Sequence, residues 1–172
     1  MVDVGKSSRL EAALTSMSGT VTDLLEQLVG EPIDAHVQGH AVTGAGIPNG
    51  LRVDEGHPLL IRAALLNGRA SGRSYLYAES VLVLSRLPQR FRLRLESSCD
   101  PIGRILDEEG IAVSRAALPG SGRGFASVTP GTPPAVGDYL LARTYRVDVE
   151  RDPVMVIAEW FLTSLERFLA PQ

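Results

Sequence analysis

Hydrophobic positions near the start of the chain recur at helical spacing, with residue types at both ends that favour helix termini. The apolar face of this predicted helix consists of Val21, Leu24, Leu25 and Leu28. Thr20 fits an N-cap, Asp23 three residues later fits an acidic variant of the capping box, and Gly30 fits a C-cap. A shorter amphipathic segment predicts another helix over Ser8–Met17.

From Pro32 onward the hydrophobic period changes to two, which predicts strands. The first strand covers 33–38. Two apolar runs, Leu59–Leu66 and Ser74–Leu84, are joined by NGRASG and predict a hairpin. A second hairpin is predicted from Tyr139–Val149 and Val154–Leu162, with its turn at 150–153.

The remaining segments predict short helices, one further strand and two loops. Asp100 fits the N-cap of a helix with Pro101 at its first position. Further helices are expected over 88–95 and 163–169, a strand over 111–118, and loops over 44–58 and 119–137. The second loop is rich in glycine and proline, and whether it forms a lid stays open. Tight turns between strands indicate an α+β domain covering 1–172, with a mostly antiparallel sheet and helices on one face.

Composition narrows the class of protein further. The chain has 172 residues, a net charge of −3 and no basic stripe, which argues against nucleic acid as a partner. Cys99 is the only cysteine, so no internal disulfide forms and a reducing cytoplasm is expected. No apolar run reaches the roughly 18 residues of a membrane span.

The standard sequence signatures of catalysis are absent. There is no P-loop, dinucleotide-binding fingerprint, nucleophile elbow or metal-spaced Cys/His cluster. His36 and His40 are expected on the same side of a strand, but without a third ligand they are better explained as solvated histidines. Cys99 precedes a helix, yet no base partner can be named, which favours a structural role.

Two ionisable residues stand inside strongly apolar strands. Arg62 lies in LLIRAALL and Glu159 in VMVIAEWFL. A charge in such a run faces solvent, finds a partner or lines a cavity. The pattern alone favours solvent, because exposed charges dominate protein surfaces. Arg143 and Arg146 approach the second hairpin and are expected on different faces, so one of them is a candidate anion contact.

Four sequence blocks, spanning Gly19 to Leu162 in order, resemble the bacterial chorismate lyase-like family, including the actinobacterial chorismate pyruvate-lyases. The blocks are GTVTDLLEQLVGEPI, PLLIRAALL, DPIGRIL and ARTYRVDVERDPVMVIAEWFL. The resemblance implies an antiparallel sheet of about six strands with helices on one side. It also implies conversion of chorismate to 4-hydroxybenzoate and pyruvate, with no metal or redox cofactor and a small carboxylated molecule as the binding partner.

The resemblance also suggests roles for individual residues. It implies that Arg62 pairs with a substrate carboxylate and that Glu159 acts near the ring hydroxyl. The backbone at Ile102 and Gly103 is expected to hold the carboxylate, and Val21 to pack against the ring. Arg143 is a further substrate-binding candidate.

Two departures from the family pattern bear on substrate identity. Arg104 stands where many relatives have a different residue, and the 119–137 loop is unusually rich in glycine and proline. One alternative is therefore a relative repurposed as a lyase, dehydratase or cyclase in secondary metabolism. Another is a non-catalytic ligand-binding domain like those of some transcription regulators. Such domains usually follow a winged-helix domain, and only about 20 residues precede the first block, which disfavours this alternative.

Overall fold

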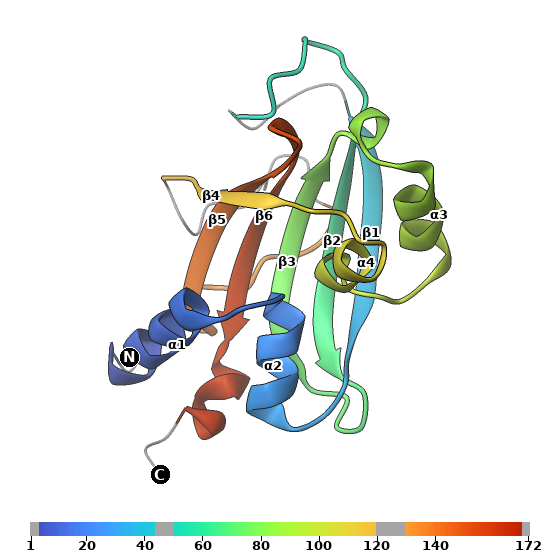
Figure 1. The fold of residues 1–172 in the computed structure, drawn as a ribbon. Coiled ribbons are helices and arrows are strands. Elements are labelled where there is room, and N and C mark those ends of the chain that lie inside the picture. Colours follow the sequence, from blue (N-terminus) through green and yellow to red (C-terminus); the bar gives the residue numbers. More distant parts are fainter. Residues whose placement is uncertain (1–3, 44–49, 120–129, 170–172) are drawn as a thin grey trace.

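The protein, described from a computed structural model, is built on one six-stranded antiparallel sheet with the strand order β1-β2-β3-β6-β5-β4 (Figure 1). The structure describes residues 4–43, 50–119 and 130–169. The helices are α1 (Val4–Ser16), α2 (Val21–Val29), α3 (Gln89–Ser97) and α4 (Ile102–Glu108), with 3-10 turns η1 (Leu84–Arg86) and η2 (Thr163–Phe168). The strands are β1 (Ile33–Thr43), β2 (Leu59–Gly68), β3 (Ser74–Leu82), β4 (Ser114–Ala117), β5 (Tyr139–Val149) and β6 (Asp152–Leu162). The predicted α+β class with about six antiparallel strands is confirmed.

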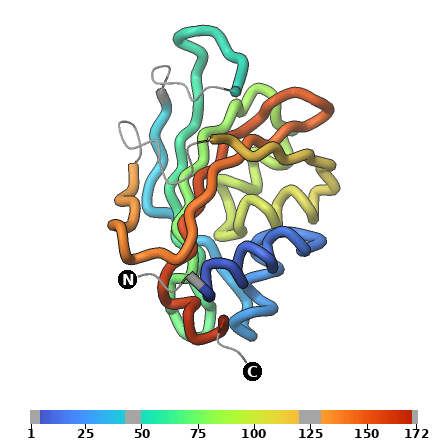
Figure 2. The backbone as a smooth tube through the Cα atoms, turned by 90° about the vertical axis from the view of Figure 1, so that its left-hand side faces the viewer, coloured from blue at the N-terminus to red at the C-terminus, as the bar shows by residue number. Residues whose placement is uncertain are grey.

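The four α-helices lie on one side of the sheet, as predicted, and residues 130–137 cross the other side (Figure 2). This crossing depends on a glycine. A Cβ added to Gly131 would lie 2.4 Å from the hydroxyl oxygen of Tyr77 and 2.5 Å from the Cβ of Ala63. The end of the predicted 119–137 loop therefore packs on the face opposite the helices, while 120–129 lies outside the described residues.

The predicted caps of α2 are confirmed. The Thr20 hydroxyl accepts the backbone N–H of Asp23 at 3.1 Å, and the Asp23 carboxylate accepts the backbone N–H of Thr20 at 2.8 Å. Gly30 ends the helix in the left-handed conformation, with φ +76°. These reciprocal bonds satisfy first-turn donors, so they fix where α2 begins.

The prediction for the start of α4 was wrong. Pro101 occupies the N-cap position, and Asp100 makes no cap hydrogen bond. The Asp100 carboxylate instead accepts hydrogen bonds from the Arg94 guanidinium at 2.9 and 3.1 Å. A charge-assisted bond to a neighbouring helix has replaced the local cap.

Both predicted hairpins form, with shifted ends. The β5–β6 turn needs only Glu150 and Arg151, whose φ values of 50° and 73° match the primed turn that suits twisted strands. The first strand extends to Thr43, whereas β4 is shorter than the predicted 111–118 segment. The first helix begins at Val4, earlier than expected. The closing helix is a 3-10 turn.

A β-bulge between Val37 and Gly39 interrupts the alternation of side chains between the two faces of β1. His36 pairs with Leu65, whereas His40 pairs with Arg62. Residues 62 and 65 point to opposite faces of β2, so the two histidines do as well. The prediction that they share a side was wrong, because alternation in a sequence does not reveal an inserted residue. Within the part of the chain that the structure describes, no group of three potential metal-binding side chains occurs.

The helix side of the sheet carries two separate hydrophobic clusters. One packs α3 and α4 against the sheet around Phe91 and Ile105, and the other packs α1, α2 and η2 around Leu25 and Phe161. The sheet surface between these clusters lies under the beginnings of α2 and α4. Among the described residues, no helix combines the length and the apolar character that crossing a membrane requires.

Candidate functional site

A pocket occupies the space between the two hydrophobic clusters, and the central strands supply its floor. Strand register aligns Arg62 with Ser80, and the next row aligns Ala64, Ala78 and Glu159. All five residues line the pocket. The small side chains in the middle of the floor leave room for a ligand, while the two ionisable residues border that space from β2 and β6.

The roof of the pocket is formed by the beginnings of α2 and α4. Thr20 and Val21 contribute from the first helix, and Pro101, Ile102 and Gly103 from the second. A Cβ on Gly103 would lie 3.1 Å from the Cβ of Thr20, so glycine allows the two helix starts to come close. The capping box of α2 and the close approach of α4 therefore both shape the roof of the pocket.

Arg62 is buried, and part of its guanidinium lacks hydrogen-bond partners within the described ranges. The residue is 2% exposed, and its Nε and Nη2 atoms have no hydrogen-bond partner among the described residues. Burial lowers the pKa of Arg62, and the nearby Cys99 thiol partly opposes that shift. A buried cation with unsatisfied donors is costly unless an anion accepts them. The geometry thus favours a ligand that carries a carboxylate or a similar group.

Glu159, which is 5% exposed, accepts two hydrogen bonds at the other side of the pocket. The Arg143 Nε donates at 2.7 Å and the Tyr145 hydroxyl at 2.8 Å. The Arg143 guanidinium also lies 4.9 Å from the centre of the Tyr145 ring. This arrangement makes Glu159 an acceptor whose orientation is fixed by two neighbours on β5.

The pKa shifts of these neighbours agree with that geometry. Burial is the largest single influence and would lower the pKa of Arg143. The charges of Glu159 and Tyr145, together with the hydrogen bonds to both residues, outweigh burial, and the pKa is raised. Burial, and then the charge of Glu159, raises the pKa of Tyr145 well above its usual value. The Tyr145 hydroxyl therefore stays protonated and donates a hydrogen bond to the Glu159 carboxylate.

The sequence-predicted site residues come together almost completely. Arg62, Glu159, Val21, Ile102 and Gly103 all line this one pocket. The strand pattern alone had favoured solvent exposure for the two charged residues, Arg62 and Glu159. In the structure both line the pocket instead.

Arg143 is bound to Glu159 and lies outside the lining of this pocket. Arg146 pairs with Val156 in the register and with Asp148 in an ion pair of 2.7 Å, so the two arginines do take different faces. Sequence reasoning missed Ser80, Tyr145 and Arg115, which also line the pocket. Spacing by two from Arg143 could have indicated Tyr145.

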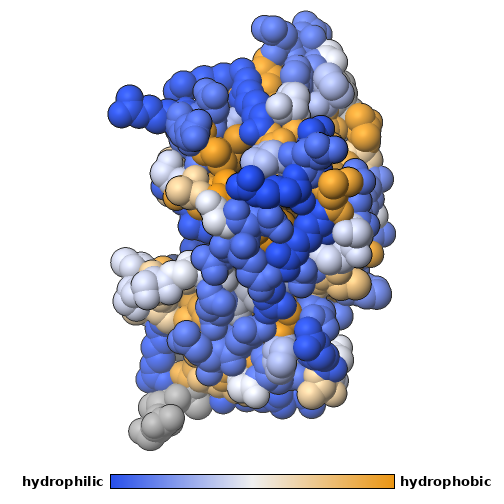
Figure 3. All heavy atoms as spheres, turned by 45° about the vertical axis from the view of Figure 1, so that its right-hand side comes forward, coloured by the Kyte–Doolittle hydropathy of each residue, from blue (hydrophilic) through white to orange (hydrophobic). Residues whose placement is uncertain are grey.

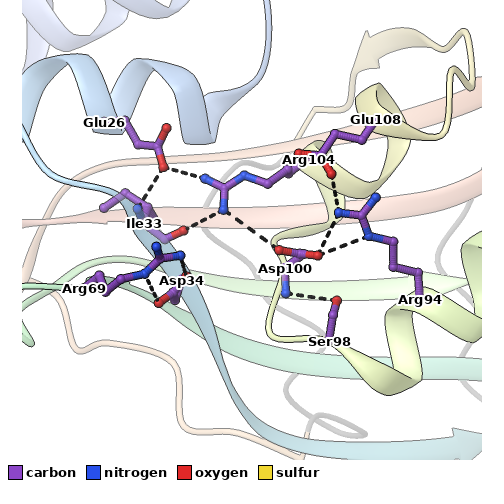
Figure 4. Close-up of polar contacts among 9 residues, drawn as sticks. All are labelled: Glu26, Ile33, Asp34, Arg69, Arg94, Ser98, Asp100, Arg104 and Glu108. Carbon is purple, nitrogen blue, oxygen red and sulfur yellow. Dashed lines mark hydrogen bonds and ion pairs between the residues drawn. The ribbon is translucent and has the colours of Figure 1, made fainter.

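A network of ion pairs and hydrogen bonds connects the helices of the roof to each other and to neighbouring elements (Figure 4). The Arg104 guanidinium binds the Glu26 carboxylate of α2 and donates to the Ile33 carbonyl oxygen of β1 at 3.1 Å. Asp100 lies 4.0 Å from Arg104 and connects it to Arg94 of α3. The outer face over α3 and α4 is correspondingly dominated by hydrophilic side chains (Figure 3). Arg104 thus ties α4 to α2.

The fold and this pocket define a class of protein: an α+β domain with a pocket between an antiparallel sheet and its helices. No protein-family model matches the chain. The chorismate pyruvate-lyase of Mycobacterium tuberculosis is 31% identical over 118 residues, which cover 63% of this chain and 55% of that protein. The chorismate pyruvate-lyase of Mycobacterium leprae is 26% identical over 174 residues, covering 95% of this chain and 79% of that protein. The chain spans about half the length of the first relative.

Two solved structures have a similar fold. PhnF from Mycobacterium smegmatis aligns with a TM-score of 0.51 at 15% identity, covering 87% of this chain and 66% of that one. A GntR-family transcriptional regulator from Bacillus cereus aligns with a TM-score of 0.50 at 13% identity, covering 77% and 92%. At such identities these likenesses concern the fold alone. The sequence relatives, together with the shared fold, support a likeness of this chain to the chorismate lyase-like family.

Proposed function

We propose that the protein is a chorismate pyruvate-lyase, which converts chorismate to 4-hydroxybenzoate and pyruvate. The observation that carries this proposal is the buried guanidinium of Arg62, two of whose nitrogen atoms lack hydrogen-bond partners among the described residues, in a pocket that also contains Glu159. Chorismate offers a ring carboxylate for the first residue and a ring hydroxyl for the second. The mycobacterial relatives named for this activity support the same substrate.

In this proposal the ring carboxylate binds Arg62 at one side of the pocket. A guanidinium suits this role because its planar fork makes two charge-assisted hydrogen bonds. The backbone N–H groups of Ile102 and Gly103 stand in the first turn of α4, where helical N–H groups have no partner within the helix. They are available to a second carboxylate oxygen.

The ring then lies over the small side chains of Ala64 and Ala78, under Val21 of the roof. Because β3 separates β2 from β6, about two strand spacings, or roughly 10 Å, lie between the backbones of Arg62 and Glu159. That separation leaves room for a six-membered ring between the two side chains. Glu159 is accordingly assigned to the ring position para to the carboxylate.

The reaction breaks the ether bond between the ring and the enolpyruvyl group and removes the hydrogen at the hydroxyl-bearing carbon. That hydrogen leaves as a proton, the departing enolpyruvate gains one proton at its methylene carbon, and the ring becomes aromatic. Since aromatisation drives the reaction, the residues mainly orient the ring and assist proton movement. Glu159, which accepts two hydrogen bonds, is suited to accept a proton or to orient the para hydroxyl.

A non-catalytic ligand-binding domain is the second candidate, favoured by the fold shared with a transcriptional regulator. Such a domain would use Arg62 for a carboxylate but would release its ligand unchanged. A repurposed lyase, dehydratase or cyclase would also retain Arg62 and Glu159 while acting on another carboxylated substrate.

One experiment separates these candidates. The protein is incubated with chorismate, and 4-hydroxybenzoate and pyruvate are measured in equal amounts if the proposal holds. Arg62→Ala is expected to lower kcat/KM by roughly 30-fold or more, from about 2–4 kcal/mol of lost carboxylate binding. Glu159→Gln should also slow the reaction.

Exposed residues outside the pocket provide matched controls, and Arg73→Ala and Glu55→Gln should leave the rate unchanged. Near-normal rates in both pocket variants would overturn the assignment. Tight binding of 4-hydroxybenzoate without turnover of chorismate would favour the non-catalytic domain.

A further inference from the structure

Arg115 on β4 stands between the pocket and a second hollow. It lines both spaces, and so does Tyr145. The outer hollow lies between the end of α1, at Leu14 and Met17, and the outer strands of the sheet, where Arg143 contributes. Arg115 is exposed and forms no ion pair with any described residue. It is therefore a cation at the entrance of the site.

The charges around the pocket do not balance. Glu159 is compensated by its ion pair of 2.7 Å with Arg143. Arg62 and Arg115 remain without an acidic partner within the described parts of the chain, and three strands separate β2 from β4 in the sheet order. The site thus presents two uncompensated positive charges on opposite sides of its floor, one buried and one at the entrance. A ligand with two negative charges would complement both.

We propose that Arg115 is a specificity-determining residue that binds the carboxylate of the substrate's enolpyruvyl side chain. This inference rests on the proposed lyase function, in which Arg62 takes the ring carboxylate. Arg115 would then distinguish the dicarboxylate substrate from the monocarboxylate product. Once the ether bond is broken, the second carboxylate belongs to pyruvate, which leaves past Arg115 through the outer hollow.

The test compares Arg115→Gln, Arg115→Lys and the exposed control Arg73→Gln for chorismate turnover and for equilibrium binding of chorismate and 4-hydroxybenzoate. Because an exposed ion pair is screened by solvent, Arg115→Gln should weaken chorismate binding and raise KM only about five- to tenfold. The kcat and the Kd for 4-hydroxybenzoate should stay within about twofold. Arg115→Lys should recover most of the affinity, and added salt should raise the KM of the wild type more than that of Arg115→Gln.

Two results would overturn the role of Arg115: equal weakening for both ligands, or no change for either. Its failure is distinguishable from failure of the lyase proposal, because wild-type turnover tests the latter alone. If the wild type binds chorismate without turning it over, the ratio of the two dissociation constants still tests Arg115. If the wild type binds neither ligand, both proposals fail. An unchanged melting temperature in Arg115→Gln will show that a lost contact in the fold is not the cause.

Discussion

Replacing Arg62 with methionine should stabilise the unliganded protein while abolishing its affinity for a carboxylate. The guanidinium is buried, and two of its nitrogen atoms lack hydrogen-bond partners. An unsatisfied buried donor costs about 1–3 kcal/mol, and exchanging a buried charge for an apolar side chain of similar length is often stabilising by about 1–4 kcal/mol. We therefore expect the free energy of unfolding to rise by about 1–3 kcal/mol. Methionine is preferred to alanine because it leaves no large cavity.

The measurement can use the intrinsic fluorescence of Trp160, the only tryptophan in the chain, which is 2% exposed and will report global unfolding. Urea denaturation should show a higher midpoint with an unchanged m-value, since the native surface is the same. For a domain of this size each kcal/mol should raise the melting temperature by about 2–4 °C. Arg73→Met, an exposed site, controls for the loss of charge.

Adding 4-hydroxybenzoate extends the test to binding. A ligand at one hundred times its Kd should stabilise the wild type by about 2.7 kcal/mol, and it should leave Arg62→Met unaffected. If Arg62→Met were less stable than the wild type, the guanidinium would be holding the fold together. If the variant still gained stability from the ligand, the carboxylate would bind elsewhere. Either result would refute the reasoning.

Three further changes test other parts of the structure. Tyr145→Phe removes one of the two donors to Glu159, so steady-state assays should show a kcat about tenfold lower, with about 1 kcal/mol of stability lost; an unchanged kcat would mean that the hydroxyl does not orient the carboxylate. Gly131→Ala would place a Cβ 2.4 Å from a tyrosine hydroxyl of β3, and urea unfolding should show a loss of about 1–3 kcal/mol, whereas no loss would contradict the packing of 130–137 on the sheet. The hydrogen bond from Arg69 lowers the pKa of Asp34 in the folded state. The Asp34–Arg69 interaction therefore stabilises the fold at pH values above the pKa of Asp34 in the unfolded chain. This stabilisation is lost as the pH falls through the pKa of Asp34 in the folded protein. The stability difference between wild type and Asp34→Asn should therefore disappear in acid, and a difference that persisted at the lowest pH would exclude this linkage.

Local signals in the sequence were sufficient to predict much of the fold. The Thr20–Asp23 capping box and Gly30 bracket α2 because their hydrogen bonds involve only neighbouring residues. Period-two alternation and turn-forming residues likewise place both hairpins. The start of α4 was mispredicted because Asp100 binds Arg94 of another helix, a contact that no local pattern encodes.

Predicting that the site residues lie together would have required the register between strands, which cannot be read from the sequence alone. Alternation shows that Arg62 points away from Ile61, but not that its face of the sheet also carries Glu159. The bulge in β1 was missed for a similar reason, since the one inserted residue that puts His36 and His40 on opposite faces leaves no signal in the alternation. Arg115 was overlooked because its strand is short and exposed, and only pairing with β5 brings it to the pocket.

The contrast between floor and roof has a consequence for how this domain can diversify. Arg62 and Glu159 belong to central strands whose neighbours build the core, so exchanging those strands would disturb the whole sheet. The roof consists of two short helix starts, held partly by the half-buried contacts of Arg104. Because the Arg104–Glu26 ion pair is only partly buried, changing it costs less stability than exchanging a central strand. We therefore expect ligand preference within such a scaffold to drift through the roof, while the carboxylate anchor in the floor persists across different substrates.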